Sequence, residues 1–107
     1  MDIRSLDSVS DVVADMAGRH YGIAALVCNA AGPHSSRTLL DRTPEDWDSD
    51  LDVNFRGPRF CVQQGAKAMI AGHRGVRAVA LASIAAPYPY ARRAHCSSSK
   101  ARIIAMA

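Results

Sequence analysis

The sequence is poor in aromatic residues and has no long uncharged apolar run, no cysteine framework and no cluster of basic residues. The missing apolar run argues against a signal peptide or membrane span. Three cysteines without framework spacing (Cys28, Cys61 and Cys96) are typical of a reducing compartment. We therefore expect a cytoplasmic protein without a membrane partner. The sequence contains no Cys-x-x-Cys or histidine-rich pattern, so no metal site is predicted.

The charge pattern argues against a nucleic-acid partner. The net charge is +3, but the basic residues are scattered and Arg92-Arg93 is their only adjacent pair. No aromatic residues are interleaved with them, so neither a phosphate-binding stripe nor a stacking surface is predicted. With 107 residues, 49% of them hydrophobic, the chain is expected to form at most one small globular domain.

The first half alternates between helical and strand patterns. A helix is predicted to open near Leu6, with Asp7 or Ser8 as its cap, and to stop around residues 18–20. The apolar run 23–28 is typical of a strand buried on both faces of a parallel sheet. It ends in a loop of small residues, 29–33, which lets a ligand approach the backbone closely.

A long helix is predicted over residues 43–71. Thr43 is expected to cap it and Pro44 to take the first helical position. Gly57-Pro58 interrupts the pattern, and Pro58 has no N–H to donate to the carbonyl of Asn54. Two readings stay open: the interruption is a harmless kink, or it frees the Asn54 carbonyl to hold a water molecule.

The stretch from Ser83 to Lys100 follows a predicted strand at 76–82. If residues 97–106 are helical, Cys96 and Lys100 share one helix face. A hydroxyl at the strand end facing a lysine on the next helix is a plausible active site. The order of the patterns predicts a slice of a three-layer α/β/α domain.

Four motifs resemble those of the short-chain dehydrogenase/reductase family, and together they cover most of the chain. Residues 26–32, Leu-Val-Cys-Asn-Ala-Ala-Gly, resemble the family's Asn-Asn-Ala-Gly turn. Residues 45–57 resemble the helix that carries its asparagine, and residues 81–85 the strand end that carries its serine. Residues 96–101 fall on the Tyr-x-x-x-Lys-Ala signature, beginning thirteen residues after Ser83.

The resemblance implies a partial Rossmann-type doubly wound parallel sheet and hydride transfer between an alcohol and a carbonyl, with NAD or NADP as cofactor. By position, it assigns catalytic roles to Asn54, Ser83, Cys96 and Lys100. It implies cofactor contacts for the following residues: Asp2, Ile3, Asn29, Ala30, Ala31 and Lys100. The implied substrate is a small alcohol or carbonyl compound.

The sequence departs from the family pattern in three ways. The glycine-rich pyrophosphate turn and first strands do not occur in these 107 residues, and neither do the later strands. We therefore expect residues 1–107 to form one partial domain with an exposed apolar sheet edge. Cys96 stands where the family has its proton-donating tyrosine, and its shorter side chain should not reach the same substrate atom. Tyr88 and Tyr90, in the preceding loop, are poor replacements.

Two functions remain open. In the first, the chain descends from a nicotinamide-dependent oxidoreductase but is inactive alone, with Cys96 as an inactivating substitution or a reactive thiol. In the second, the helices at 43–71 and 97–107, which commonly pack a dimer interface in the family, make the chain a non-catalytic interaction module. It would pair with a second copy or with an intact relative.

Overall fold

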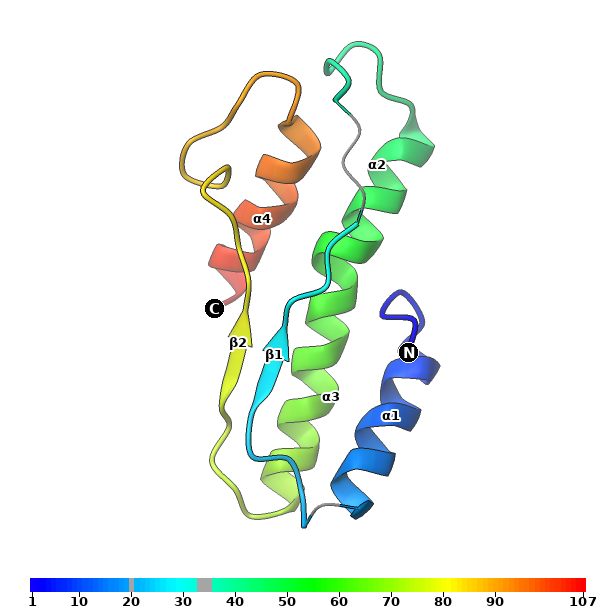
Figure 1. The fold of residues 1–107 in the computed structure, drawn as a ribbon, viewed down its shortest axis with the longest axis vertical. Helices are drawn as coiled ribbons and strands as arrows, with labels where there is room; N and C mark the ends of the chain where they lie inside the picture. Colours follow the sequence, from blue (N-terminus) through cyan, green and yellow to red (C-terminus); the bar gives the residue numbers. More distant parts are fainter. Residues whose placement is uncertain (20, 33–35) are drawn as a thin grey trace.

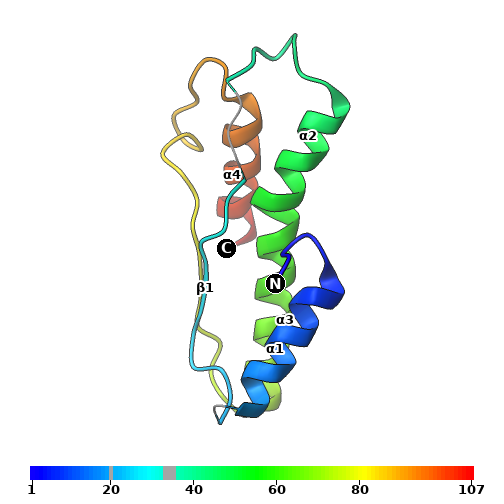
Figure 2. The ribbon, with the colours of Figure 1, turned by 45° about the vertical axis from the view of Figure 1, so that its right-hand side comes forward.

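The computed structural model describes residues 1–19, 21–32 and 36–107 of the chain. Three helical segments follow one another without a break and form a single rod along the long axis (Figure 1). Helix α1 packs against the lower half of this rod, and α4 lies beside its upper half, as the rotated view also shows (Figure 2). The elements in chain order are α1 (Leu6–Arg19), β1 (Leu26–Cys28), α2 (Pro44–Leu51), η1 (Asp52–Arg56), α3 (Gly57–Ala71), β2 (Ala78–Ala80) and α4 (Ala94–Met106).

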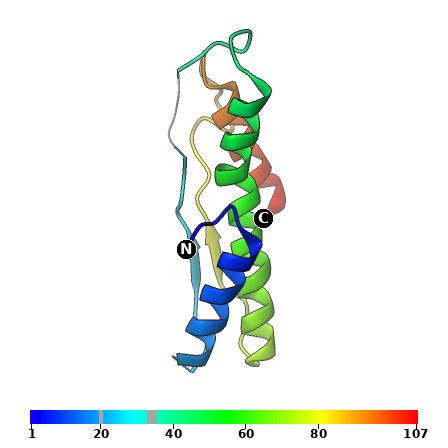
Figure 3. The ribbon, with the colours of Figure 1, turned by 90° about the vertical axis from the view of Figure 1, so that its right-hand side faces the viewer.

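The two strands form a parallel sheet in which Val27 lies opposite Val79. Parallel strands need a long crossover, and here the rod of α2, η1 and α3 supplies it. The helices lie on one face of the sheet (Figure 3), so the described residues form an α/β arrangement of two layers. The radius of gyration is 15.2 Å, whereas a compact domain of this length would have about 13 Å. The molecule is therefore elongated, with little interior.

Both strands are shorter than the sequence predicts. The runs 23–28 and 76–82 each contribute only three residues to the sheet. The prediction that the first run is buried on both faces is wrong for Val27, which is 63% exposed. The reason is that successive strand residues point to opposite faces, and helices cover only one of these faces.

Helix α1 begins at the predicted residue but has a different cap. Ser5, rather than Asp7 or Ser8, accepts a hydrogen bond from a first-turn amide, that of Ser8, at 3.3 Å. The Ser8 hydroxyl itself accepts from the amide of Asp2 at 2.9 Å and so holds the N-terminus against the helix. Helix α1 extends to Arg19, and the last residue of the predicted stop, His20, lies outside the described residues, as does Pro33 of the small-residue loop.

The start of α2 is as predicted. The Thr43 side chain accepts from the amide of Asp46, and the Asp46 carboxylate accepts from the amide of Thr43, which together make a capping box. Pro44 occupies the first turn, where its missing N–H costs nothing.

The predicted interruption of the long helix is a π-helical turn, η1, directly before Gly57-Pro58. The amide of Gly57 bonds to the carbonyl of Asp52, five residues back. Gly57 also allows a close approach, because a Cβ atom there would lie 2.8 Å from the side chain of Ile3. The wide turn and the glycine together bring the N-terminal segment against the middle of the rod.

The apolar core is small and lies between α1, α3 and β1. Its buried centre consists of Val9, Cys28 and Cys61, one residue from each of these elements. Partly buried apolar side chains surround this centre: Ile3, Val13, Leu26, Phe60, Val62 and Ala80. This cluster ties the N-terminal half together. On α4, Ile103 is buried as well, beside buried polar side chains such as His95 and Ser99.

Candidate functional site

The site is built around the first turns of α4. The helix begins at Ala94, three residues before the Ser97 start considered from the sequence. Arg92, with a positive φ of 61°, turns the chain into the helix, and the Arg93 carbonyl accepts from the Ser97 amide at 2.9 Å. Cys96 and Lys100 are therefore one turn apart inside the helix, and only 7% and 6% of their surfaces are exposed.

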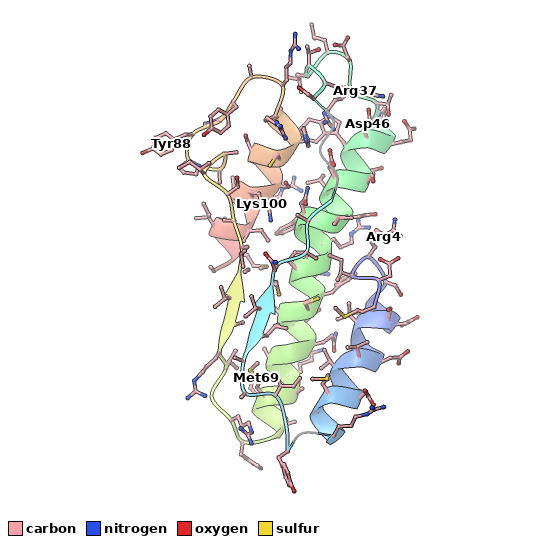
Figure 4. All side chains as sticks on the ribbon, in the orientation of Figure 1. Arg4, Arg37, Asp46, Met69, Tyr88 and Lys100 are labelled. Carbon is pink, nitrogen blue, oxygen red and sulfur yellow. The ribbon has the colours of Figure 1, made fainter. Side chains whose placement is uncertain are left out.

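Lys100 connects this helix to the end of β2. Its Nζ donates to the carbonyl of Leu81 at 2.7 Å (Figure 4). Burial lowers the pKa of Lys100, and nearby Cys96 opposes that shift. One of the three ammonium protons is used by Leu81, which leaves two for other partners.

Ser83 and Cys96 line one cavity of about 350 Å³ between the end of the β2 segment and α4. The Ser83 hydroxyl accepts from the Ala85 amide at 3.1 Å, which fixes its place in the turn. Both tyrosines are exposed, but Tyr90 lines the same cavity, whereas Tyr88 lies at the outer edge of the loop (Figure 4). Of the two tyrosines, Tyr90 is thus the one beside Ser83 and Cys96.

Asn54 lies in the π turn η1, which packs against α4. It is fully buried, and its Oδ1 accepts from the amide of Gly32 at 3.1 Å. Its Nδ2 has no hydrogen-bond partner within the described part of the chain. A buried donor without a partner is a place for a bound water molecule. The structure thus puts Asn54 in the turn that packs against the site helix, and its hydrogen bond among the described residues goes to Gly32.

A buried polar cluster that no sequence motif predicted lies at the start of α4. Arg42 donates to the Asp50 carboxylate on α2 at 2.6 Å. It also lies 3.2 Å from Nε2 of His95, the residue before Cys96. Arg42 and His95 are 53 positions apart, so no local pattern could have joined them.

The predicted cofactor residues divide into two groups. Ile3, Asn29 and Ala30 line a second cavity, of about 230 Å³, beside β1. Asp2 does not line it. Instead, Asp2 is exposed and pairs with Arg4 at 2.8 Å, and this hydrogen-bonded guanidinium lowers the carboxyl pKa to about 2.

Ala31 is exposed and is not among the residues lining that cavity, and Lys100 lies at the other site, next to Leu81. Of the groups that a dinucleotide would need, these residues offer a mostly apolar wall and an ammonium group, in two separate places. The sequence offers no glycine-rich turn for its phosphates.

The described residues lack two other features. No group of three or more His, Cys, Asp or Glu side chains in this part of the chain is arranged to hold a metal ion. Within the same residues, no helix has the length and apolar character needed to cross a membrane.

Comparison with known proteins identifies the family. The sequence profile of the short chain dehydrogenase family matches residues 1–107. Sorbitol dehydrogenase of Cereibacter sphaeroides is 34% identical over 83 residues, which are 78% of this chain and 32% of that protein. Acetoacetyl-CoA reductase of a Synechocystis species is 28% identical over 105 residues, which are 98% of this chain and 42% of that protein.

The fold agrees with this assignment. The crystal structure of carveol dehydrogenase from Mycobacterium avium, in complex with NAD, superimposes with a TM-score of 0.94 at 22% identity. The match covers 99% of this chain and 38% of that one, so the chain spans about two-fifths of the proteins it resembles. The structure is thus part of a Rossmann-type α/β domain, and the chain belongs to the short-chain dehydrogenase family of oxidoreductases.

Proposed function

We propose that residues 1–107 form one partial domain that carries part of the active site of a nicotinamide-dependent oxidoreductase. The reaction class is hydride transfer between an alcohol and a carbonyl, on a small-molecule substrate. The observation that carries this proposal is the convergence of Ser83, Cys96 and Lys100 at the junction of α4 and the β2 end. Three cysteines that are all free support a reducing, cytoplasmic setting for this function.

Each residue has a role that its surroundings suit. The Ser83 hydroxyl, fixed by its turn and open to the cavity, is placed to donate to the substrate oxygen. Lys100 would hold the nicotinamide ribose with its remaining ammonium protons, and its charge favours deprotonation of a neighbouring acid. The nicotinamide, when bound, supplies or accepts the hydride.

We assign to Asn54 the role of binding a water molecule that relays protons between the site and solvent. Its buried Nδ2 can donate to such a water, and Pro58, four residues on, has no N–H for the Asn54 carbonyl. For the other end of the cofactor we assign the wall made by Ile3, Asn29 and Ala30 to the adenine. Asp2 and Ala31 keep their assignment as cofactor contacts on the basis of family position alone.

We further propose that the 107-residue chain does not catalyse this reaction alone. Cys96 takes the position of the proton-donating tyrosine, and a thiol on a single methylene falls several ångströms short of where a phenol would end. In addition, the sequence supplies no turn for the cofactor phosphates. Titration of the chain with NADH and NADPH, followed by fluorescence or calorimetry, is expected to show no micromolar binding. Micromolar binding of either would refute this part of the proposal.

The role of Cys96 is tested separately by replacing the matching segment of a full-length relative, such as the acetoacetyl-CoA reductase, with residues 1–107. We expect the Cys96→Tyr form of this chimera to turn over substrate at least ~100-fold faster than the Cys96 form, the usual contribution of a positioned proton donor. A Cys96→Ser form controls for removal of the thiol alone and should remain slow. Equal rates for cysteine and tyrosine would contradict the assignment.

A second candidate function, an interaction module, rests on a groove across the rod and α4. The groove, of about 300 Å³, is lined by acidic, basic and apolar side chains: Asp48, Leu51, Asp52, Phe55, Arg56, Arg59 and Arg102. Within it Arg102 lies over the ring of Phe55, 5.7 Å from its centre. Because it carries both charge signs, this surface could pair with a second copy of itself or with an intact relative. Co-purification with a full-length relative would support this function, whereas a monomer by light scattering, together with no co-purification, would refute it.

A further inference from the structure

The core contains a pair of cysteines that the proposed reaction does not use. Cys28 ends β1 and Cys61 lies in α3, one turn after Pro58. Both are 93% buried, and with Val9 they form the centre of the apolar core. They also line the same cavity beside β1. Two elements that are distant in sequence thus bring their thiols to one place.

The surroundings of the pair disfavour thiolates. Burial raises the pKa of the Cys28 thiol to about 11, and the neighbouring Cys61 thiol adds to this shift. The backbone carbonyl of Pro58, 3.9 Å from the Cys28 sulfur, is a weak acceptor at that distance. A neutral, apolar sulfur pair would suit this environment better than two S–H groups with poor partners.

From this placement we propose that Cys28 and Cys61 form an oxidisable dithiol that closes into an intramolecular disulfide between β1 and α3. The oxidant is a low-molecular-weight disulfide such as glutathione disulfide. One cysteine thiolate attacks a glutathione sulfur and releases one glutathione thiolate. The second cysteine thiolate then attacks the protein sulfur of the mixed disulfide, which forms the Sγ–Sγ bond and releases the second glutathione. The protein loses two hydrogens, and the oxidant is reduced to two thiols.

The size of the cavity bears on which product of this reaction is favoured. The cavity is small, about 230 Å³, is lined by both cysteines, and its other lining residues are apolar apart from Asn29. A glutathione group attached to either cysteine would find little room in this cavity, which favours its displacement by the second thiol. The resulting bond would tie the end of β1, which leads into Asn29 and Ala30, to the turn of α3 that follows Pro58.

The test uses the Cys96→Ser form of the chain, in which Cys28 and Cys61 are the only thiols. After incubation with glutathione disulfide, thiols are counted in denaturant and the intact mass is measured. We expect both thiols to disappear together, the mass to fall by two hydrogens, no disulfide-linked dimer to form, and dithiothreitol to restore both thiols. The rate should rise about tenfold per pH unit from neutral to mildly alkaline pH, because the thiolate is the attacking species.

Matched variants separate this outcome from general thiol reactivity. Adding Cys28→Ala or Cys61→Ala leaves one thiol, for which no intramolecular product exists and no loss of two hydrogens is expected. A stable glutathione adduct in the two-cysteine form, a disulfide-linked dimer, or two thiols that remain free would each overturn the proposal. None of these readouts depends on catalytic activity, so the result is independent of the proposed function.

Discussion

Replacing Asp50 by asparagine is expected to destabilise the protein more than any equivalent change on its surface. The substitution keeps the shape of the side chain but removes the negative charge that faces Arg42, 2.6 Å away. The Arg42 side chain is fully buried, and that of Asp50 is 11% exposed. The guanidinium would keep its charge and lose its carboxylate in a region of low dielectric.

The magnitude follows from known buried pairs. Breaking such a pair by removing one partner costs about 3–5 kcal/mol, and the amide oxygen retained by asparagine reduces this to about 2–3 kcal/mol. A small domain of this length has a total stability of about 5–15 kcal/mol, and the thin core places this chain near the lower end. Asp50→Asn should therefore remove a large share of the free energy of unfolding.

The assay is urea unfolding followed by circular dichroism and by the fluorescence of Trp47, the single tryptophan, which lies on α2 with Asp50. Asp15→Asn is the matched control, because Asp15 pairs with Arg19 at the same distance of 2.6 Å in an exposed i,i+4 pair. Its expected cost is about 0.3–0.5 kcal/mol. If Asp50→Asn costs no more than Asp15→Asn, the cluster is not what holds α4 in place.

Three further outcomes follow from the structure. Thr43→Ala removes a capping-box hydroxyl and should cost about 1 kcal/mol in urea unfolding; no change would mean that Pro44 alone starts the helix. Gly57→Ala places a Cβ 2.8 Å from the Ile3 side chain and should cost about 1–3 kcal/mol, whereas Gly18→Ala, with open space around it, should stabilise by about 0.5 kcal/mol. Because Arg4 lowers the Asp2 pKa from 3.8 to about 2, the stabilisation from this pair is present above pH 3.8 and is lost as the pH falls towards 2. Arg4→Ala should return the Asp2 pKa, measured by NMR, to its ordinary value; an unchanged pKa would contradict the pairing.

Local signals in the sequence were sufficient for the presence of the helices and for the order of the site motifs, but not for the cap of α1 or the first residue of α4. The capping pattern at Thr43 and Pro44 is formed by neighbouring residues, so it could be read directly. The family resemblance rested on motif spacing and is confirmed. The missing N–H of Pro58 predicted a disturbance of the long helix, and the π turn appears there. These features depend on contacts within one or two turns.

Contacts between distant segments decided the rest. The pairing of Arg42 with His95, 53 positions apart, joins segments whose relation no local pattern encodes. The exposure of Val27 depends on which face of the sheet the helices cover, which its own apolar sequence does not specify. The sequence alone therefore determined the family and the positions of Ser83, Cys96 and Lys100 along the chain. Only the tertiary structure decided their surroundings, because burial and polar pairing arise when separate elements pack together.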